Sequence, residues 1–236
     1  MLKILNERTC LSDIREINQL GIVRFEKYFG NHKRSQDLFM LKYESDIYDP
    51  KKWNLVSNQD NINLYTSEVA DSSYLALKAE SEVNCNIHNA IDFLRNINNI
   101  TTYNHTINST ELIKKFSQNM LLYKTNTVKM YGISARDFIL FHNHHFNKEE
   151  NSHYIFSLSV DNESINKKYK KDNNNVRGEI IISGHYLQEL DENKCKIALI
   201  THVELNGSIP SIAINNLIHN DTVVIFKNLI KKLEEK

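Results

Sequence analysis

The chain contains the stretch Ile133-Ser134-Ala135-Arg136-Asp137-Phe138, and three shorter stretches follow it. They are Val176-Arg177-Gly178-Glu179, Ser183-Gly184-His185-Tyr186 and Asn206-Gly207-Ser208-Ile209-Pro210. The first three lie in segments of strand-like composition, and the fourth combines the residues of a turn with a proline suited to the first turn of a helix. None of the four is a catalytic motif: a glycine-rich phosphate loop and a Gly-x-Ser-x-Gly elbow are both missing from the sequence.

Strand-like runs extend on both sides of these stretches, and their short spacing predicts antiparallel pairing. Residues 75–83 alternate clearly, as expected for a strand with one buried face. A short helix is predicted for residues 89–96 with Asn89 as its cap, and a polar turn for residues 101–106. The predicted strands are 53–57, 62–69, 75–83, 109–117, 119–129, 137–146, 152–160, 176–188 and 194–205.

The segment after Pro210 is the clearest helix of the sequence. Its apolar residues fall on one stripe, at steps of four or seven: Ile214, Ile218, Ile225, Leu229 and Leu233. The sequence therefore predicts an α+β fold, in which a curved antiparallel sheet of about nine strands wraps on a long C-terminal helix. Residues 1–50 are expected to form an N-terminal helical arm packed on a domain of residues 51–236.

Composition narrows the possible functions. The formal net charge is +0, so nothing global attracts nucleic acid. Hydrophobic residues make up 41% of the chain, but no apolar run approaches the roughly 18 residues that cross a bilayer. The N-terminus turns polar at once, so a cytoplasmic protein is expected. Cys10, Cys85 and Cys195 lack metal-ligand spacing and are expected to be buried thiols, and no cofactor is predicted.

The motifs and their order resemble the START family, the lipid-carrying domains related to steroidogenic acute regulatory protein. Arg136-Asp137-Phe138 stands where the family has Arg-Asp-Phe or Arg-Asp-Tyr, and Gly207-Ser208-Ile209-Pro210 resembles the entry to its lid helix. Trp53-Asn54-Leu55-Val56 resembles its opening hairpin. The resemblance implies a helix-grip fold with an internal hydrophobic cavity. It also implies a monomer that carries one lipid, associates peripherally with membranes and catalyses no reaction.

The polar sites of known family members are altered in this sequence. Phosphatidylcholine carriers hold the headgroup with an aspartate and an arginine, and the matching positions here are Asn104 and Ile100. Sterol-binding members place a buried acid and an arginine in the cavity, and the matching positions are Tyr123 and His142. Because the sterol-type pair is missing, a phospholipid is the preferred ligand. A sterol or single-chain lipid carrier, or a lipid-sensing regulatory module without transfer activity, is the alternative.

The expected cavity residues follow from strand alternation, with the family precedent deciding which face points inward. Phe138, Leu140 and His142 share that face, and Tyr123 points inward with Leu121 from the preceding strand. Tyr123 and His142 are predicted to meet the polar head or hydroxyl of the lipid. Alternatively, they bond each other or water in a satisfied core. The other expected lipid contacts are Tyr103, Ile214, Ile218 and Ile225.

Two further clusters invite chemical hypotheses. His142 and His144 share a strand face and could begin a metal site, but no neighbouring Cys or His completes it, so a solvent-facing strand end is predicted instead. Arg136 and Asp137 are predicted to form a structural salt bridge. No catalytic residue is predicted, and an enzyme of this architecture would have only His142 as an acid or base in the cavity.

A basic loop surrounds Tyr169, and it is either a solvated surface or a docking site for anionic membrane. The resemblance implies that a second loop, with apolar tips, lies beside it and dips into the membrane interface. The predicted docking residues are Met130, Tyr131, Ile133, Lys167, Lys168, Lys170 and Lys171.

Overall fold

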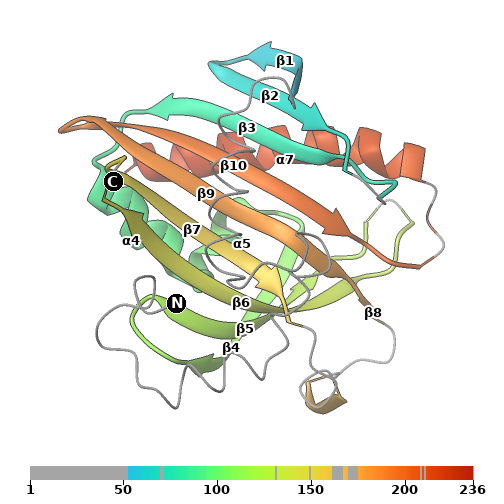
Figure 1. Ribbon diagram of the computed structural model, residues 1–236. Coiled ribbons are helices and arrows are strands. Elements are labelled where there is room, and N and C mark those ends of the chain that lie inside the picture. The colour runs from blue at the N-terminus through green and yellow to red at the C-terminus, as the bar shows by residue number, and fades with distance from the viewer. Residues whose placement is uncertain are drawn as a thin grey trace, which may run out of the picture.

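This computed structural model describes residues 53–69, 72–130, 132–148, 150–160, 167–169, 175–207, 209 and 211–235, without the side chains of residues 211–217. The predicted N-terminal arm lies outside these residues. The described part of the chain forms one ten-stranded sheet with a long C-terminal helix along one side (Figure 1).

Nine strands follow one another across the sheet in the order β1-β2-β3-β10-β9-β7-β6-β5-β4, and all these neighbours are antiparallel. The short β8 pairs in parallel with β6. The strands are β1 Asn54–Gln59, β2 Ile62–Ser67, β3 Ala76–Val83, β4 Ile107–Lys115, β5 Met120–Thr127, β6 Arg136–Asn147, β7 Ser152–Ser159, β8 Val176–Arg177, β9 Glu179–Asp191 and β10 Lys194–Glu204.

The predicted single strand 176–188 is wrong, because the structure divides it at Gly178 into β8 and β9. At Gly178, where the strand divides, the backbone passes over the ring of Phe138. A Cβ added to Gly178 would lie only 2.3 Å from Cε1 of Phe138. Glycine permits this close approach. The chain thereby leaves its pairing with β6 and joins β7.

The inner helix α4 (Ile87–Arg95) begins earlier than predicted. Its N-cap is Asn86, whose side-chain oxygen accepts a hydrogen bond from the backbone N–H of His88 at 2.9 Å, so the predicted cap at Asn89 is wrong. The expected turn at 101–106 is wrong in its first half, where η2 (Ile97–Asn99) leads into α5 (Ile100–Tyr103).

The terminal helix α7 (Ser211–Glu234) agrees with the prediction, and Pro210 lies outside the described residues. Phe226, Leu229 and Leu233 are fully buried in a cluster that also contains residues of α4 and of the sheet. Figure 1 shows α7 lying along β3 and β10, with α4 near its C-terminal end. This helix-bearing side of the sheet is called the inner face below, and the opposite side the outer face.

The outer face carries a second apolar cluster, which includes Tyr154 and Tyr186. The expectation that β3 is buried on one face only is therefore wrong. Lys78 on β3 is only 5% exposed, and its Nζ lies 4.4 Å from the ring centroid of Tyr65 and 5.2 Å from that of Trp53. Such cation–π contacts compensate partly for the loss of water around the ammonium group.

Cys85 and Cys195 are buried free thiols, and Cys10 lies outside the described residues. None of the described helices is both long and apolar enough to cross a bilayer.

Candidate functional site

A cavity of about 240 Å³ lies between the inner face of the sheet and α7. Its walls come from β6, β9, β10, the loop between β5 and β6, and the middle of α7. The volume is below the roughly 300–1,000 Å³ of typical ligand pockets. A two-chain lipid therefore enters this cavity only if its walls move apart.

The predicted cavity residues are placed in three ways. Phe138, Ile218 and Ile225 line the cavity. Tyr123 and Leu140 belong to the same buried cluster as Phe138, and Leu121 packs against this cluster. Tyr103 packs among the helices, with its ring centroid 6.0 Å from that of Phe93, and the side chain of Ile214 is not among those described.

Tyr123 and His142 are joined through a third side chain that the sequence did not single out. The Tyr123 hydroxyl donates to Oγ of Ser157 at 3.2 Å, and this Oγ lies 3.0 Å from Nδ1 of His142. Ser157 pairs with Ser183 of the next strand, and Ser183 lines the cavity. The polar chain therefore adjoins the inner end of the cavity. Ser157 lies two residues from Ile155 on β7, and residues two apart share a face of the strand, so strand periodicity would have placed Ser157 on the inner face.

Burial keeps this polar chain uncharged. It lowers the pKa of His142 to about 4, with a smaller contribution from the positive charge of Arg95, and it raises the pKa of Tyr123 to about 12. The Tyr123 and His142 side chains are not bonded to each other, and Nε2 of His142 has no hydrogen-bond partner among the described residues. The core at this point is therefore only partly satisfied.

The other end of the cavity is held together by Arg136, which is 4% exposed. Its guanidinium donates to the carbonyl of Leu205 at 3.0 Å, to that of Asn206 at 2.9 Å and to that of Ser134. Asn206 and Gly207 both have positive φ, 54° and 82°. Arg136 thus ties the loop between β5 and β6 to the left-handed segment that leads into α7.

The salt bridge predicted between Arg136 and Asp137 is wrong, because neighbouring residues of a strand point to opposite faces. Asp137 instead receives two hydrogen bonds from Arg177, at 3.0 Å and 2.7 Å. Nζ of the buried Lys124 lies 3.4 Å from the same carboxylate. Asp137 is therefore held in an ion cluster, with partners on β5 and β8.

Of the predicted docking residues, Met130 and Ile133 face each other across a tight turn. The Ile133 N–H donates to the Met130 carbonyl at 2.9 Å, Gly132 between them has φ of 75°, and both apolar side chains line the cavity. This turn therefore forms part of the cavity wall.

The basic loop is attached to the sheet at Tyr169. The Tyr169 carbonyl accepts a hydrogen bond from Nζ of Lys124 at 2.9 Å, and Lys167 and Lys168 beside it are exposed. The other predicted docking residues, Tyr131, Lys170 and Lys171, lie outside the described residues.

The histidines of β6 do not form the solvent-facing strand end that was predicted. His142 is buried, and Nε2 of His144 lies 3.0 Å from Nδ1 of His153, with the two rings stacked. Among the described residues, no three His, Cys, Asp or Glu side chains are placed to hold a metal ion.

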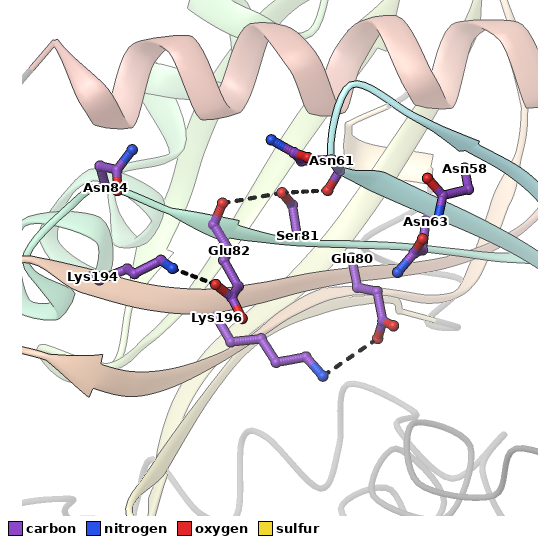
Figure 2. Close-up of a pocket in the computed structure, with 9 residues that line it drawn as sticks. All are labelled: Asn58, Asn61, Asn63, Glu80, Ser81, Glu82, Asn84, Lys194 and Lys196. Atoms are coloured by element: carbon purple, nitrogen blue, oxygen red, sulfur yellow. Dashed lines mark hydrogen bonds and ion pairs between the residues drawn. The ribbon is translucent and has the colours of Figure 1, made fainter.

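A second pocket, of about 530 Å³, lies at β1, β2, β3 and β10 (Figure 2). Its basic groups are matched by acids: Lys194 pairs with Glu82, and Lys196 lies 3.7 Å from Glu80. The remaining lining is four asparagines and Ser81. It offers no apolar wall for a lipid chain, so the cavity under α7 is the candidate site.

Comparisons with known proteins agree with this fold. A family model described as "START domain" matches residues 35–236. The crystal structure of human STARD10 has a TM-score of 0.73 and 18% identity, covering 85% of this chain and 80% of that chain. Human StAR-related lipid transfer protein 5 has a TM-score of 0.73 and 16% identity, covering 84% of this chain and 92% of that chain. No curated protein sequence matches.

A bacterial structure extends the likeness. A fragment of the STAR-related lipid transfer protein from Xanthomonas axonopodis has a TM-score of 0.66 and 17% identity, covering 77% of this chain and 98% of that chain. These likenesses concern the fold, and the predicted helix-grip architecture is confirmed.

Proposed function

This chain belongs to the START domain family, and we propose that it binds one lipid in the cavity under α7 and carries it between membranes. The observation that carries the proposal is an apolar cavity between sheet and lid helix that ends at a partly satisfied polar chain. Apolar walls shelter acyl chains at about 0.8 kcal/mol per buried CH₂, and the polar end receives the head.

Exchange requires an opening, and the bonds of Arg136 indicate where it forms. The loop between β5 and β6 and the segment before α7 meet at this guanidinium. Docking of the apolar turn at Met130 and Ile133, with Lys167 and Lys168 on anionic headgroups, would draw the loop away from α7. Tyr131, Lys170 and Lys171 are assigned to the same docking surface. The lipid then passes between loop and helix.

A phospholipid is the proposed ligand, because the acid and arginine of sterol-binding relatives are replaced by Tyr123 and His142. The protein is proposed to act as a cytoplasmic, membrane-peripheral monomer without catalytic activity. A sterol, a single-chain lipid or a purely sensing role are the competing functions that the experiment below separates.

The test begins with mass spectrometry of the purified full chain, native and then after organic extraction. A stoichiometric phospholipid is expected, and transfer of fluorescent phosphatidylcholine between vesicles should follow. Binding without transfer would favour a lipid-sensing module. No lipid before or after incubation with mixed liposomes would overturn the proposal.

Two neighbouring residues of α7 give a matched pair of variants. Ile225 lines the cavity, whereas Val224 is 45% exposed. Ile225→Trp fills the cavity and should abolish lipid uptake, and Val224→Trp adds the same side chain outside it and should leave uptake intact. Equal uptake by both variants would place the lipid elsewhere.

A further inference from the structure

Buried nitrogen atoms without partners are concentrated at one place on the inner face. Five buried side-chain atoms lack a hydrogen-bond partner among the described residues, and four of these belong to Arg95, His142, His144 and His185. Nearly all buried polar atoms in folded proteins are paired, so such a concentration requires an explanation. A ligand that supplies the missing acceptors is one.

The strand register places the three histidines on one face of the sheet, with Ile155 between His144 and His185. His144 on β6 pairs with Ile155 on β7, and Ile155 pairs with His185 on β9. Directly paired residues share a face, and neighbouring strands lie about 4.8 Å apart. His142 follows on the same face two residues from His144. All three imidazoles therefore point to the side that α4 covers.

Arg95, the last residue of α4, reaches the same edge. Its Nη2 donates to the Gln118 carbonyl at 3.0 Å, and the next carbonyl, that of Asn119, accepts the backbone N–H of His144 at 2.9 Å. Its nearest acid among the described residues is Asp92, at 3.8 Å with a side chain 81% exposed. Solvent screens such a pair strongly, so the described residues do not neutralise the guanidinium charge.

The histidines beside this guanidinium are uncharged. Ser157 accepts from Tyr123 and keeps one hydrogen that it can donate to Nδ1 of His142. In that tautomer Nε2 of His142 carries a hydrogen and is free to donate. Burial, together with the charge of Arg95, lowers the pKa of His142 and of His144. The cluster therefore combines one fixed positive charge with uncharged imidazoles, and no described residue adds a buried carboxylate to it.

We propose that Arg95, His142, His144 and His185 bind the phosphate group of the carried lipid, with its acyl chains extending from the cluster towards α7. The inference rests on the proposed carrier function. Phosphate oxygens suit the site because arginine and N–H donors bind them through short, charge-assisted hydrogen bonds. Ser183 links the cluster to the cavity, since it lines the cavity and pairs with Ser157.

In the test, the full chain is incubated with vesicles that contain equal amounts of phosphatidic acid and diacylglycerol with the same acyl chains. The lipids that the protein retains are then measured by mass spectrometry. Wild-type protein should retain phosphatidic acid in preference. Arg95→Gln should lower the ratio of phosphatidic acid to diacylglycerol about tenfold or more, the loss expected for a charge-assisted hydrogen bond, and leave diacylglycerol uptake unchanged.

The matched control is Lys115→Gln, which removes an exposed positive charge near the same end of the sheet and should not alter the ratio. His185→Phe is a second variant that should lower it. Thermal unfolding checks that each variant is folded. An unchanged ratio in both Arg95→Gln and His185→Phe overturns the phosphate site while the carrier function stands. Failure of the wild type to take up either lipid overturns the carrier function itself.

A final arm separates a lipid phosphate from free phosphate. Millimolar inorganic phosphate in the buffer should leave phosphatidic acid bound, because the acyl chains add affinity that the free ion lacks. Displacement by inorganic phosphate would show that the cluster serves the free anion, and would overturn its assignment to a lipid.

Discussion

Arg136 and Arg95 place guanidinium groups at opposite ends of the inner face, and the two are used differently. Arg136 is almost fully buried and donates to three backbone carbonyls, which hold a loop to the start of α7. Arg95 donates to one carbonyl and keeps a buried Nε without a partner among the described residues. A saturated guanidinium fixes structure, whereas an unsaturated one keeps hydrogen-bonding capacity for a ligand.

The largest expected effect on stability follows from removing the guanidinium of Arg136. Arg136→Leu leaves three carbonyls without their donor and should lower the free energy of unfolding by about 3–5 kcal/mol. Arg95→Leu removes one carbonyl bond and should cost only about 1 kcal/mol. Urea denaturation of both variants measures the difference. Equal losses would mean that the two arginines have the same structural role.

Acidic pH should lower the stability of the protein through His142, near the inner end of the cavity. Burial holds the pKa of His142 at about 4, below the ordinary value of 6.5, so between these values the unfolded chain binds the additional proton. The stability is therefore full above about pH 6.5 and falls as the pH is lowered towards 4, by about 1.4 kcal/mol per pH unit for this histidine.

Urea denaturation across this pH range gives the slope. His142→Phe should lower the slope by about 1.4 kcal/mol per pH unit. The remaining slope belongs to His144, His153 and His185, whose pKa values burial also lowers. Arg136→Leu should keep the whole slope, since arginine stays charged throughout. A slope that His142→Phe leaves unchanged would show that this imidazole titrates normally.

The smallest effect concerns the polar chain. Tyr123→Phe removes one neutral hydrogen bond to Ser157 and should lower the free energy of unfolding by about 1 kcal/mol. Tyr103→Phe is the control, because the described residues give the Tyr103 hydroxyl no hydrogen-bond partner. If the two variants lose the same stability, the bond to Ser157 contributes nothing measurable.

Local patterns in the sequence were sufficient for the sheet and for α7, because alternation and helical stripes report burial directly. They failed where the outcome depends on distant partners. The cap of α4 moved from Asn89 to Asn86, and the strand through Gly178 divided because of the Phe138 ring across the sheet. Tyr103, one of the expected lipid contacts, packs with Phe93, and its role in lipid binding stays a prediction.

The polar site depends even more on the register between strands. Ser157 joins Tyr123 to His142 only because β7 pairs with β6 in one particular alignment. Arg95 looks like an ordinary basic residue at a helix C-terminus, and only the position of α4 beside the hairpin of β4 and β5 brings it to the histidines. No spacing in the sequence encodes either contact.

The pairing of β3 with β10 has a consequence for synthesis. Strands β1 to β3 form one half of the sheet and β4 to β7 the other, and the β9–β10 hairpin joins them when Val83 meets Cys195. During synthesis on the ribosome, each half has an unpaired strand edge until the β9–β10 hairpin has been translated, at about 5–20 residues per second. Open strand edges attract other chains. We therefore expect chains that stop before Lys194 to aggregate during expression, and the full chain to benefit from chaperones that shield nascent edges.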